Sequence, residues 1–304
     1  MTKYPMLLNP CPRSMIWGGD RLKTKFNKVA PFDTLGESWE LTCRPEADSI
    51  IANGEYKGQR LRDVINCTDS FPLLIKFIDA RDDLSVQVHP DDNVKDENGN
   101  SLGKTEMWYI IEADEGAELI FGLRDDVSKE KFEELVRRGD FEIALKRVKV
   151  KPGDCYFIPA GQVHAIGKGI LLAEIQQNSD TTYRLYDYGR LDKDGNPREL
   201  HIEKALSVIK KFSTEDIDGI RFSLGNSLNC LANCSKFSVH LKKAPINTIS
   251  SSPFSALLCI SGKGEIICND IHYTACAGDT FYCPEGLEME ITGNITFIEA
   301  ISNT

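Results

Sequence analysis

A glutamine and a histidine two positions apart are the first residues whose types and spacing suit metal binding. Gln87 and His89 lie in segment 84–89, where apolar and polar residues alternate strictly, a pattern that predicts a strand. Residues two apart on a strand point to the same face, so Gln87 and His89 share one face while Val86 and Val88 face a packing layer. If the polar face lines the inside of a β structure, the glutamine oxygen and an imidazole nitrogen converge there.

Glu106 and His164 complete the candidate ligand set. Glu106 lies at the start of an apolar run, and His164 follows a turn at Pro159–Gly161. Two neutral imidazoles, a carboxylate and an amide oxygen suit Zn²⁺, and they leave a coordination position for water or substrate. A glutamine–histidine pair on a strand is more often a half-buried polar face without a metal, and spacing alone does not show that four side chains meet. The metal site is therefore a hypothesis that needs a fold to bring these residues together.

Short strands are the main elements that must position these residues. Apolar or alternating runs at 71–78, 107–112 and 117–122 predict strands, and Gly and Pro residues punctuate the chain between them. Regularly spaced strands with turn signals favour a β-sandwich or barrel. Two stretches have helical spacing instead, 128–148 as two short helices and 200–212 as one. We expect a mainly β protein with these helices as insertions.

A faint internal repeat predicts two modules of the jelly-roll type. The pattern G-D-x₄-P-x-G occurs at Gly153–Gly161 and again at Gly278–Gly286, and in both copies it predicts a turn, a strand and a terminating turn. Upstream, segments 108–122 and 256–269 each have the pattern of a strand, a glycine-containing turn and a second strand. Two copies of one such unit favour two jelly-roll modules.

The two copies differ at the positions of the candidate ligands. Five residues after the repeat's proline, the first copy has His164 and the second has Met289, while Glu106 corresponds to Phe254. The first module therefore keeps candidate ligands that the second lacks. We predict two domains, a catalytic domain at 1–245 with helical insertions and a smaller C-terminal domain at 246–304 without metal ligands.

Composition excludes several classes of protein. The 304 residues carry a formal net charge of −10, and the sequence has no basic run apart from the short segment 146–151. Both features argue against nucleic-acid binding. No apolar run reaches the roughly 18–20 residues that a membrane helix needs. The ten cysteines form no CxxC motif, and the N-terminus does not have the pattern of a signal peptide. We expect reduced thiols in a cytoplasmic protein with no membrane or nucleic-acid partner.

Several separate motifs, in order along nearly the whole chain, resemble those of the type I mannose-6-phosphate isomerases. The likeness is closest to the short bacterial branch of that family, which has a compact helical part. The segments that carry it are Ile16–Gly19, Gly36–Glu40, Leu73–Ala80, Leu84–Asp92, Lys104–Tyr109, Pro159–Ile166 and Glu174–Asp187.

The resemblance implies a cupin fold and one Zn²⁺ per chain in an enzyme that interconverts mannose 6-phosphate and fructose 6-phosphate. It leaves the oligomeric state open. Residue by residue, it implies metal binding by Gln87, His89, Glu106 and His164, of which the last three are the firmer; catalytic roles for Arg184, Lys104 and Glu174; and substrate binding by Ser85 and by Arg190, where longer relatives carry a phosphate-contacting lysine.

The chemistry of an aldose–ketose isomerisation limits the roles of these residues. A proton moves between two carbons through an enediol or enediolate, so the site needs a base and a group that stabilises negative charge. Arg184 stays protonated at working pH, which suits charge stabilisation and excludes it as the base. Lys104, Glu174 and a metal-bound water remain candidates for the base.

Other interpretations of these residues and of the protein stay open at this point. Without the resemblance, Lys104 is as readily a solvated charge and Glu174 an outward strand residue, while Arg184 pairs with Asp180 or Asp187. The alternatives for the protein are a metal-dependent cupin dioxygenase, a non-catalytic sugar-phosphate-binding cupin, and an isomerase for a different sugar phosphate.

Overall fold

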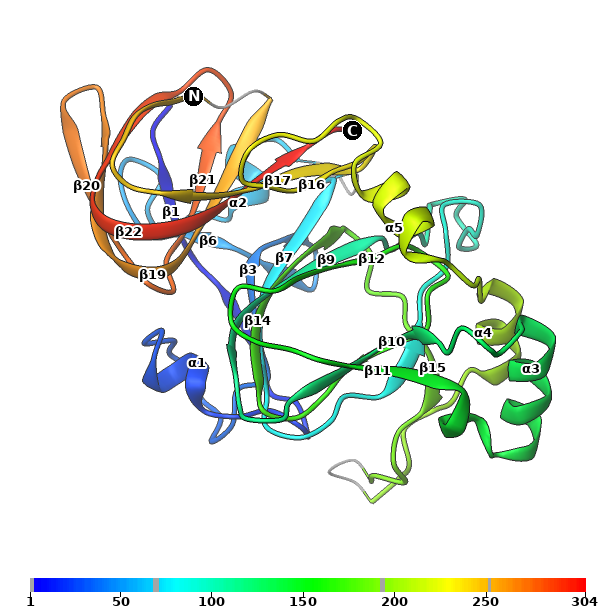
Figure 1. Ribbon diagram of the computed structural model, residues 1–304. Coiled ribbons are helices and arrows are strands. Elements are labelled where there is room, and N and C mark those ends of the chain that lie inside the picture. Colours follow the sequence, from blue (N-terminus) through cyan, green and yellow to red (C-terminus); the bar gives the residue numbers. More distant parts are fainter. Residues whose placement is uncertain (1–2, 68–70, 192–194, 251–252) are drawn as a thin grey trace. The chain divides into compact units, whose positions relative to one another are not determined.

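The computed structural model describes residues 3–67, 71–191, 195–250 and 253–304, and the chain is mainly β (Figure 1). Clustering of contacts divides it into two compact units. The first comprises the chain up to Ser14, Asp20–Phe77 and Arg221–Thr304, and the second comprises Met15–Gly19 and Ile78–Ile220. These units do not coincide with the predicted boundary at residue 245, because the N-terminal residues join the strands after Arg221. The predicted functional division between 1–245 and 246–304 stays a prediction.

The first unit is built on one large antiparallel sheet with strand order β16-β17-β22-β19-β21-β1-β6, to which β18 and β20 are added at β22 and β19. Its apolar core includes Phe281, Phe297 and Met289. The elements of this unit are β1 (Met6–Asn9), β2 (Cys11–Arg13), α1 (Arg21–Thr24), β3 (Glu37–Leu41), β4 (Cys43–Arg44), β5 (Ala47–Asp48), β6 (Ile50–Ile51), α2 (Leu61–Val64), β16 (Cys230–Asn233), β17 (Phe237–Lys243), β18 (Ile246–Ser250), β19 (Phe254–Cys268), β20 (Ile271–Cys276), β21 (Thr280–Pro284) and β22 (Glu288–Ser302).

The predicted strand–turn–strand over 256–269 is wrong, since this segment belongs to the single long strand β19. Its glycines serve close packing against β22 instead of a turn. A Cβ on Gly264 would lie 2.2 Å from the carbonyl oxygen of Thr292, and one on Gly262 would lie 1.9 Å from that of Asn294. The strand predicted by the second repeat copy is confirmed as β21.

The second unit contains two sheets. One has the order β11-β10-β13-β8-β15, and the other brings together β12, β9, β14 and the end of β7. The elements are β7 (Leu73–Ala80), along which the chain passes from the first unit to the second, β8 (Val86–Val88), β9 (Glu106–Ala113), β10 (Glu118–Leu123), α3 (Lys129–Arg138), the 3₁₀-helix η1 (Phe141–Ala144), β11 (Leu145–Lys149), β12 (Cys155–Ile158), β13 (His164–Ile166), β14 (Ile170–Gln177), β15 (Tyr183–Tyr186), α4 (Ile202–Val208) and α5 (Thr214–Arg221).

The helical insertions are confirmed with one correction. Helix α3 begins at the Ser128 cap and ends at Gly139, whose left-handed backbone stops it, and η1 follows. Of the two short helices predicted within 128–148, the second ends earlier than expected, because residues from Leu145 form β11 and pair with β10. The segment 200–212 contains α4, as expected, whereas α5 had no clear sequence signal.

Strand alternation divides the second unit into two apolar layers. Val86 and Val88 pack with the helices α3 and α4 on the outer face of the first sheet, as the alternating pattern predicts. Trp108, Ile166 and Leu172 come from both sheets and fill the space between them. Gln87 therefore faces the interior of this β-sandwich, where any shared site must lie.

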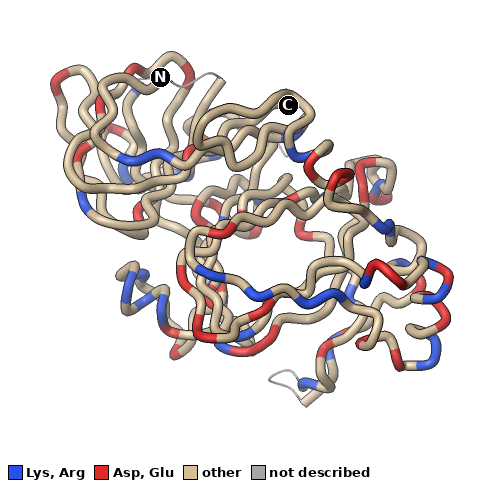
Figure 2. The backbone as a smooth tube through the Cα atoms, viewed as in Figure 1, with Lys and Arg blue, Asp and Glu red and all other residues tan. Residues whose placement is uncertain are grey.

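Charges of both signs are spread over the described chain, and Figure 2 shows a continuous run of Lys and Arg only over short stretches such as β11. Within the described residues, no helix has the length and apolar character needed to cross a membrane.

Candidate metal centre

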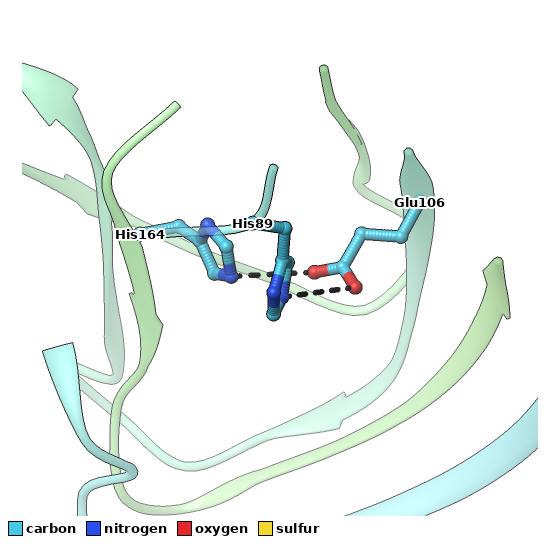
Figure 3. Close-up of side chains that lie close together, drawn as sticks. All are labelled: His89, Glu106 and His164. Carbon is cyan, nitrogen blue, oxygen red and sulfur yellow. Dashed lines mark ion pairs between the residues drawn. The ribbon is translucent and has the colours of Figure 1, made fainter. Parts of the chain in front are cut away.

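Three buried side chains from different elements converge in the interior of the second unit (Figure 3). His89, Glu106 and His164 offer ligand atoms that all lie within 4.8 Å of one another. The Nε2 atom of His89 is 3.5 Å from Glu106 Oε2, and that of His164 is 3.4 Å from Glu106 Oε1. At most 1% of each side chain is exposed, so water does not screen this cluster.

The two sheets of the unit supply these side chains from opposite sides. His164 begins β13 and pairs with Gln87 of β8, and His89 follows β8 directly. Glu106 begins β9, where it pairs with Ile158 of β12. The fold thus unites residues that are far apart in sequence, which spacing alone did not establish.

Backbone carbonyls fix both imidazoles with their Nε2 atoms toward Glu106. His89 Nδ1 is 2.8 Å from the carbonyl oxygen of Thr181, and His164 Nδ1 is 2.9 Å from that of Gln162. A carbonyl only accepts hydrogen bonds, so each Nδ1 carries a proton, and in the neutral form of each ring the Nε2 atom has the free lone pair. Burial lowers the pKa of His164 to about 4, and the nearby Lys104 adds to this effect. This ring is neutral near pH 7, as a metal ligand must be.

The donor set therefore fits a divalent cation. Two imidazole nitrogens and a carboxylate point at a shared position, and a backbone carbonyl holds each ring at its other nitrogen, an arrangement typical of metal-binding histidines. Gln87 reaches the same place, since its Nε2 lies 3.3 Å from His164 Nε2. A half-turn of this amide directs its oxygen to that place, so the geometry is compatible with the predicted role of Gln87 as a fourth ligand.

Lys104 and Glu174 lie directly beside the three converging residues. Lys104 Nζ contacts Glu106 and lies 3.1 Å from His89 Nε2 and 3.9 Å from Glu174 Oε1. Trp108 Nε1 donates to Glu174 Oε2 over 2.9 Å. Both charged side chains are buried, so the interpretation of Lys104 as a solvated charge and of Glu174 as an outward strand residue is wrong.

Arg184 approaches the centre from β15, which pairs with β8 at Gln87. Its Nε donates to Ser85 Oγ over 3.3 Å, and Ser85 Oγ donates to Gln87 Oε1 over 3.3 Å. Its Nη1 donates to the carbonyl of Glu199. Burial lowers the pKa of Arg184, with further lowering by the neighbouring Arg198, although guanidinium groups stay protonated in proteins. Ser85 and Arg184 are therefore linked by hydrogen bonds to a side chain of the centre.

Arg190 lies in a second charged cluster, formed with Asp187 and Arg198, whose charges interact with that of Arg184. The buried carboxylate of Asp187 accepts hydrogen bonds from Arg190 and from Arg198, whose Nε lies 2.6 Å from Oδ2. Burial tends to raise the pKa of Asp187, but the hydrogen bonds from Arg198 and Arg190 outweigh it and lower the value. Arg190 also contacts the carbonyl of Asp83. Sequence reasoning missed Arg198, which lies in a loop-like segment with no periodic signal.

Comparisons with known proteins identify the family of the chain. The model of the phosphomannose isomerase type I catalytic domain matches residues 6–126. Over 96% of the chain, the sequence is 40% identical to mannose-6-phosphate isomerase ManA of Bacillus subtilis, 97% of which is covered. The chain belongs to the type I phosphomannose isomerase family.

Further members of this family support the same assignment. Mannose-6-phosphate isomerase of Streptococcus mutans is 36% identical, with 98% of each chain covered. The crystal structure of the mannose 6-phosphate isomerase from Bacillus subtilis superposes with a TM-score of 0.86 at 34% identity, covering 98% of this chain and 99% of that one. A phosphomannose isomerase mutant from Salmonella typhimurium has a TM-score of 0.78 at 15% identity, and that likeness concerns the fold alone. The cupin-like fold expected from the resemblance is thereby confirmed.

Proposed function

We propose that this protein is a zinc-dependent isomerase that interconverts mannose 6-phosphate and fructose 6-phosphate. The observation that carries the proposal is the convergence of His89, Glu106 and His164 beside Lys104 and Glu174 in a member of this family. One Zn²⁺ per chain, held by these three residues with Gln87 as fourth ligand, acts when bound as a Lewis acid toward a sugar oxygen.

We assign proton transfer between the two sugar carbons to Lys104 and Glu174. Lys104 Nζ and Glu174 Oε1 lie 3.9 Å apart, so both groups can serve the same proton, and the one in its deprotonated form is the base that takes it from one carbon and returns it to the other. Trp108 orients the Glu174 carboxylate by donating to one of its oxygens, which leaves the other oxygen on the side of Lys104. Burial of both groups excludes water, which protects an enediolate from premature protonation.

Charge stabilisation and substrate binding fall to the residues on and after β15. The permanent positive charge of Arg184 suits the negative charge that develops on the sugar oxygens, and Ser85 beside it is placed to bind a hydroxyl. Arg190 and Arg198 outnumber the one carboxylate between them, so this cluster keeps a net positive charge. We assign to it the phosphate group, because guanidinium forks match phosphate oxygens.

The test is a coupled assay with mannose 6-phosphate on a sample whose metal content is measured in parallel. The proposal predicts turnover that scales with zinc content and persists without oxygen. A protein that binds the sugar phosphate without turnover would instead be a non-catalytic cupin. Turnover only in the presence of oxygen would favour a dioxygenase, and preference for another sugar phosphate would identify a different isomerase.

A further inference from the structure

Two polar residues in the family-like motifs take no part in the proposed chemistry, yet they lie between the segments that carry it. Asp92 comes three residues after His89, and Gln177 comes three residues after Glu174. Gln177 Nε2 donates to Asp92 Oδ1 over 2.9 Å. Gln177 Oε1 accepts from the backbone N–H of Thr105 over 2.9 Å. Thr105 itself lies between Lys104 and Glu106, so one side chain connects three functional segments.

The polarity of this connection requires an amide. The Thr105 N–H only donates and the Asp92 carboxylate accepts, so Gln177 must offer an oxygen to one and a nitrogen to the other. The two neighbours therefore fix which end of the amide is which. Glutamate has no donor for Asp92, and an apolar residue of similar length serves neither neighbour.

A second arm attaches the loop before Lys104 to the same aspartate oxygen. Ser101 Oγ donates to Asp92 Oδ1 over 2.8 Å, and Gly103 N donates to Ser101 Oγ over 3.1 Å. The backbone at Gly103 packs so closely that a Cβ there would lie 2.1 Å from Asp92 Oδ1 and 2.9 Å from its backbone nitrogen. Segment 101–105 is thus held against Asp92 by both hydrogen bonds and packing.

We propose that Asp92 and Gln177 are positioning residues that hold Lys104 and Glu106 in register with His89 and Glu174. This inference rests on the proposed function, because the hydrogen bonds of Gln177 with Asp92 and Thr105 supply the alignment that metal binding and proton transfer require. Metal ligands a few tenths of an ångström out of place bind more weakly, and loss of residues that orient ligands costs about 10- to 100-fold in metal affinity or activity.

The test uses Gln177→Glu in the full-length protein. This variant keeps an oxygen for Thr105 N–H but places a second acceptor and a like charge against Asp92. We expect zinc affinity, measured by competition with a chelator, to fall about 10- to 100-fold. We also expect faster amide hydrogen exchange in a peptide covering 104–106 and a lower kcat, with KM for mannose 6-phosphate changed less.

Two further variants separate positioning from general stability. Asp92→Asn combined with Gln177→Glu places an amide N–H donor opposite the new carboxylate, so the double variant should regain much of the zinc affinity that Gln177→Glu loses. Asp96→Asn is the matched control, because Asp96 accepts its side-chain hydrogen bonds from Asn98 and Asn100 within the same loop. It should leave zinc affinity and exchange at 104–106 unchanged.

The outcomes distinguish this inference from the proposed function. Wild-type protein that binds neither zinc nor mannose 6-phosphate contradicts the proposed function. Hydrogen exchange at 104–106 in wild type and Gln177→Glu still tests whether Asp92 and Gln177 hold this segment in place. Wild-type exchange and zinc affinity in the Gln177→Glu variant would overturn the inference. So would equal losses in the Asp96→Asn control, or no recovery when Asp92→Asn is added.

Discussion

Acidification of the metal-free protein tests the burial of His164. Burial lowers the pKa of this ring from an ordinary value near 6.5 to about 4. Between these values the unfolded chain takes up a proton that the folded chain refuses, so stability falls as the pH decreases. The full difference corresponds to about 3 kcal/mol, of which about 2 kcal/mol is lost between pH 7 and pH 5.

The assay is urea unfolding after treatment with a chelator, at pH 7 and pH 5, for wild type and His164→Asn. The asparagine amide can still donate to the carbonyl of Gln162, but it does not titrate. Because asparagine does not take up a proton in this range, the variant should lose about 2 kcal/mol less than wild type on acidification. His272→Asn, at an exposed histidine, serves as the control and should behave like wild type. An equal pH response of wild type and His164→Asn would refute the reasoning.

Three other predictions address catalysis, metal and an unrelated buried charge. Arg184→Ala should keep its zinc and lose about 100-fold or more in kcat, since it removes a charge that stabilises the transition state; undiminished kcat would show that its role is misassigned. Chelator-treated protein should lose activity and regain it with Zn²⁺, and full activity of the metal-free form would mean that the ligand set is misread. Burial raises the pKa of Asp48 to about 6, so this carboxylate opposes folding more as the pH rises above about 4. Asp48→Asn should therefore raise the free energy of unfolding by about 1 kcal/mol at pH 7 and by much less at pH 4, as measured by urea unfolding, whereas the same gain at both values would exclude charge burial as its cause.

The local arrangement of the centre was predictable where strand alternation determines it. Alternation placed Gln87 opposite to Val86 and Val88, and the structure shows the two valines in the layer under the helices. Lys104 and Glu106 are likewise two residues apart, and both reach His89. A period of two is a property of the backbone itself, so it survives whatever the strand packs against.

Features that depend on tertiary pairing were not predictable in the same way. The glycines of β19 have the pattern of a turn, but their purpose is close approach to β22, a strand distant in sequence. Leu145 and Val148 fit a helical period until β10 offers a pairing edge. Arg198 joins Arg190 only because both bind Asp187, and a single arginine in a loop gives no local sign of such a cluster. The cytoplasmic location stays a prediction.

X-ray absorption at the zinc edge of the reconstituted protein tests the central claim most directly. The account predicts one zinc per chain, surrounded by nitrogen and oxygen ligands with scattering from two imidazoles, because His89, Glu106 and His164 converge and no cysteine belongs to the cluster. The alternative is zinc bound by some of the ten cysteines of the chain, and sulfur ligands would be detected in the same spectrum. Sulfur in the coordination shell, or no bound zinc, would contradict the account.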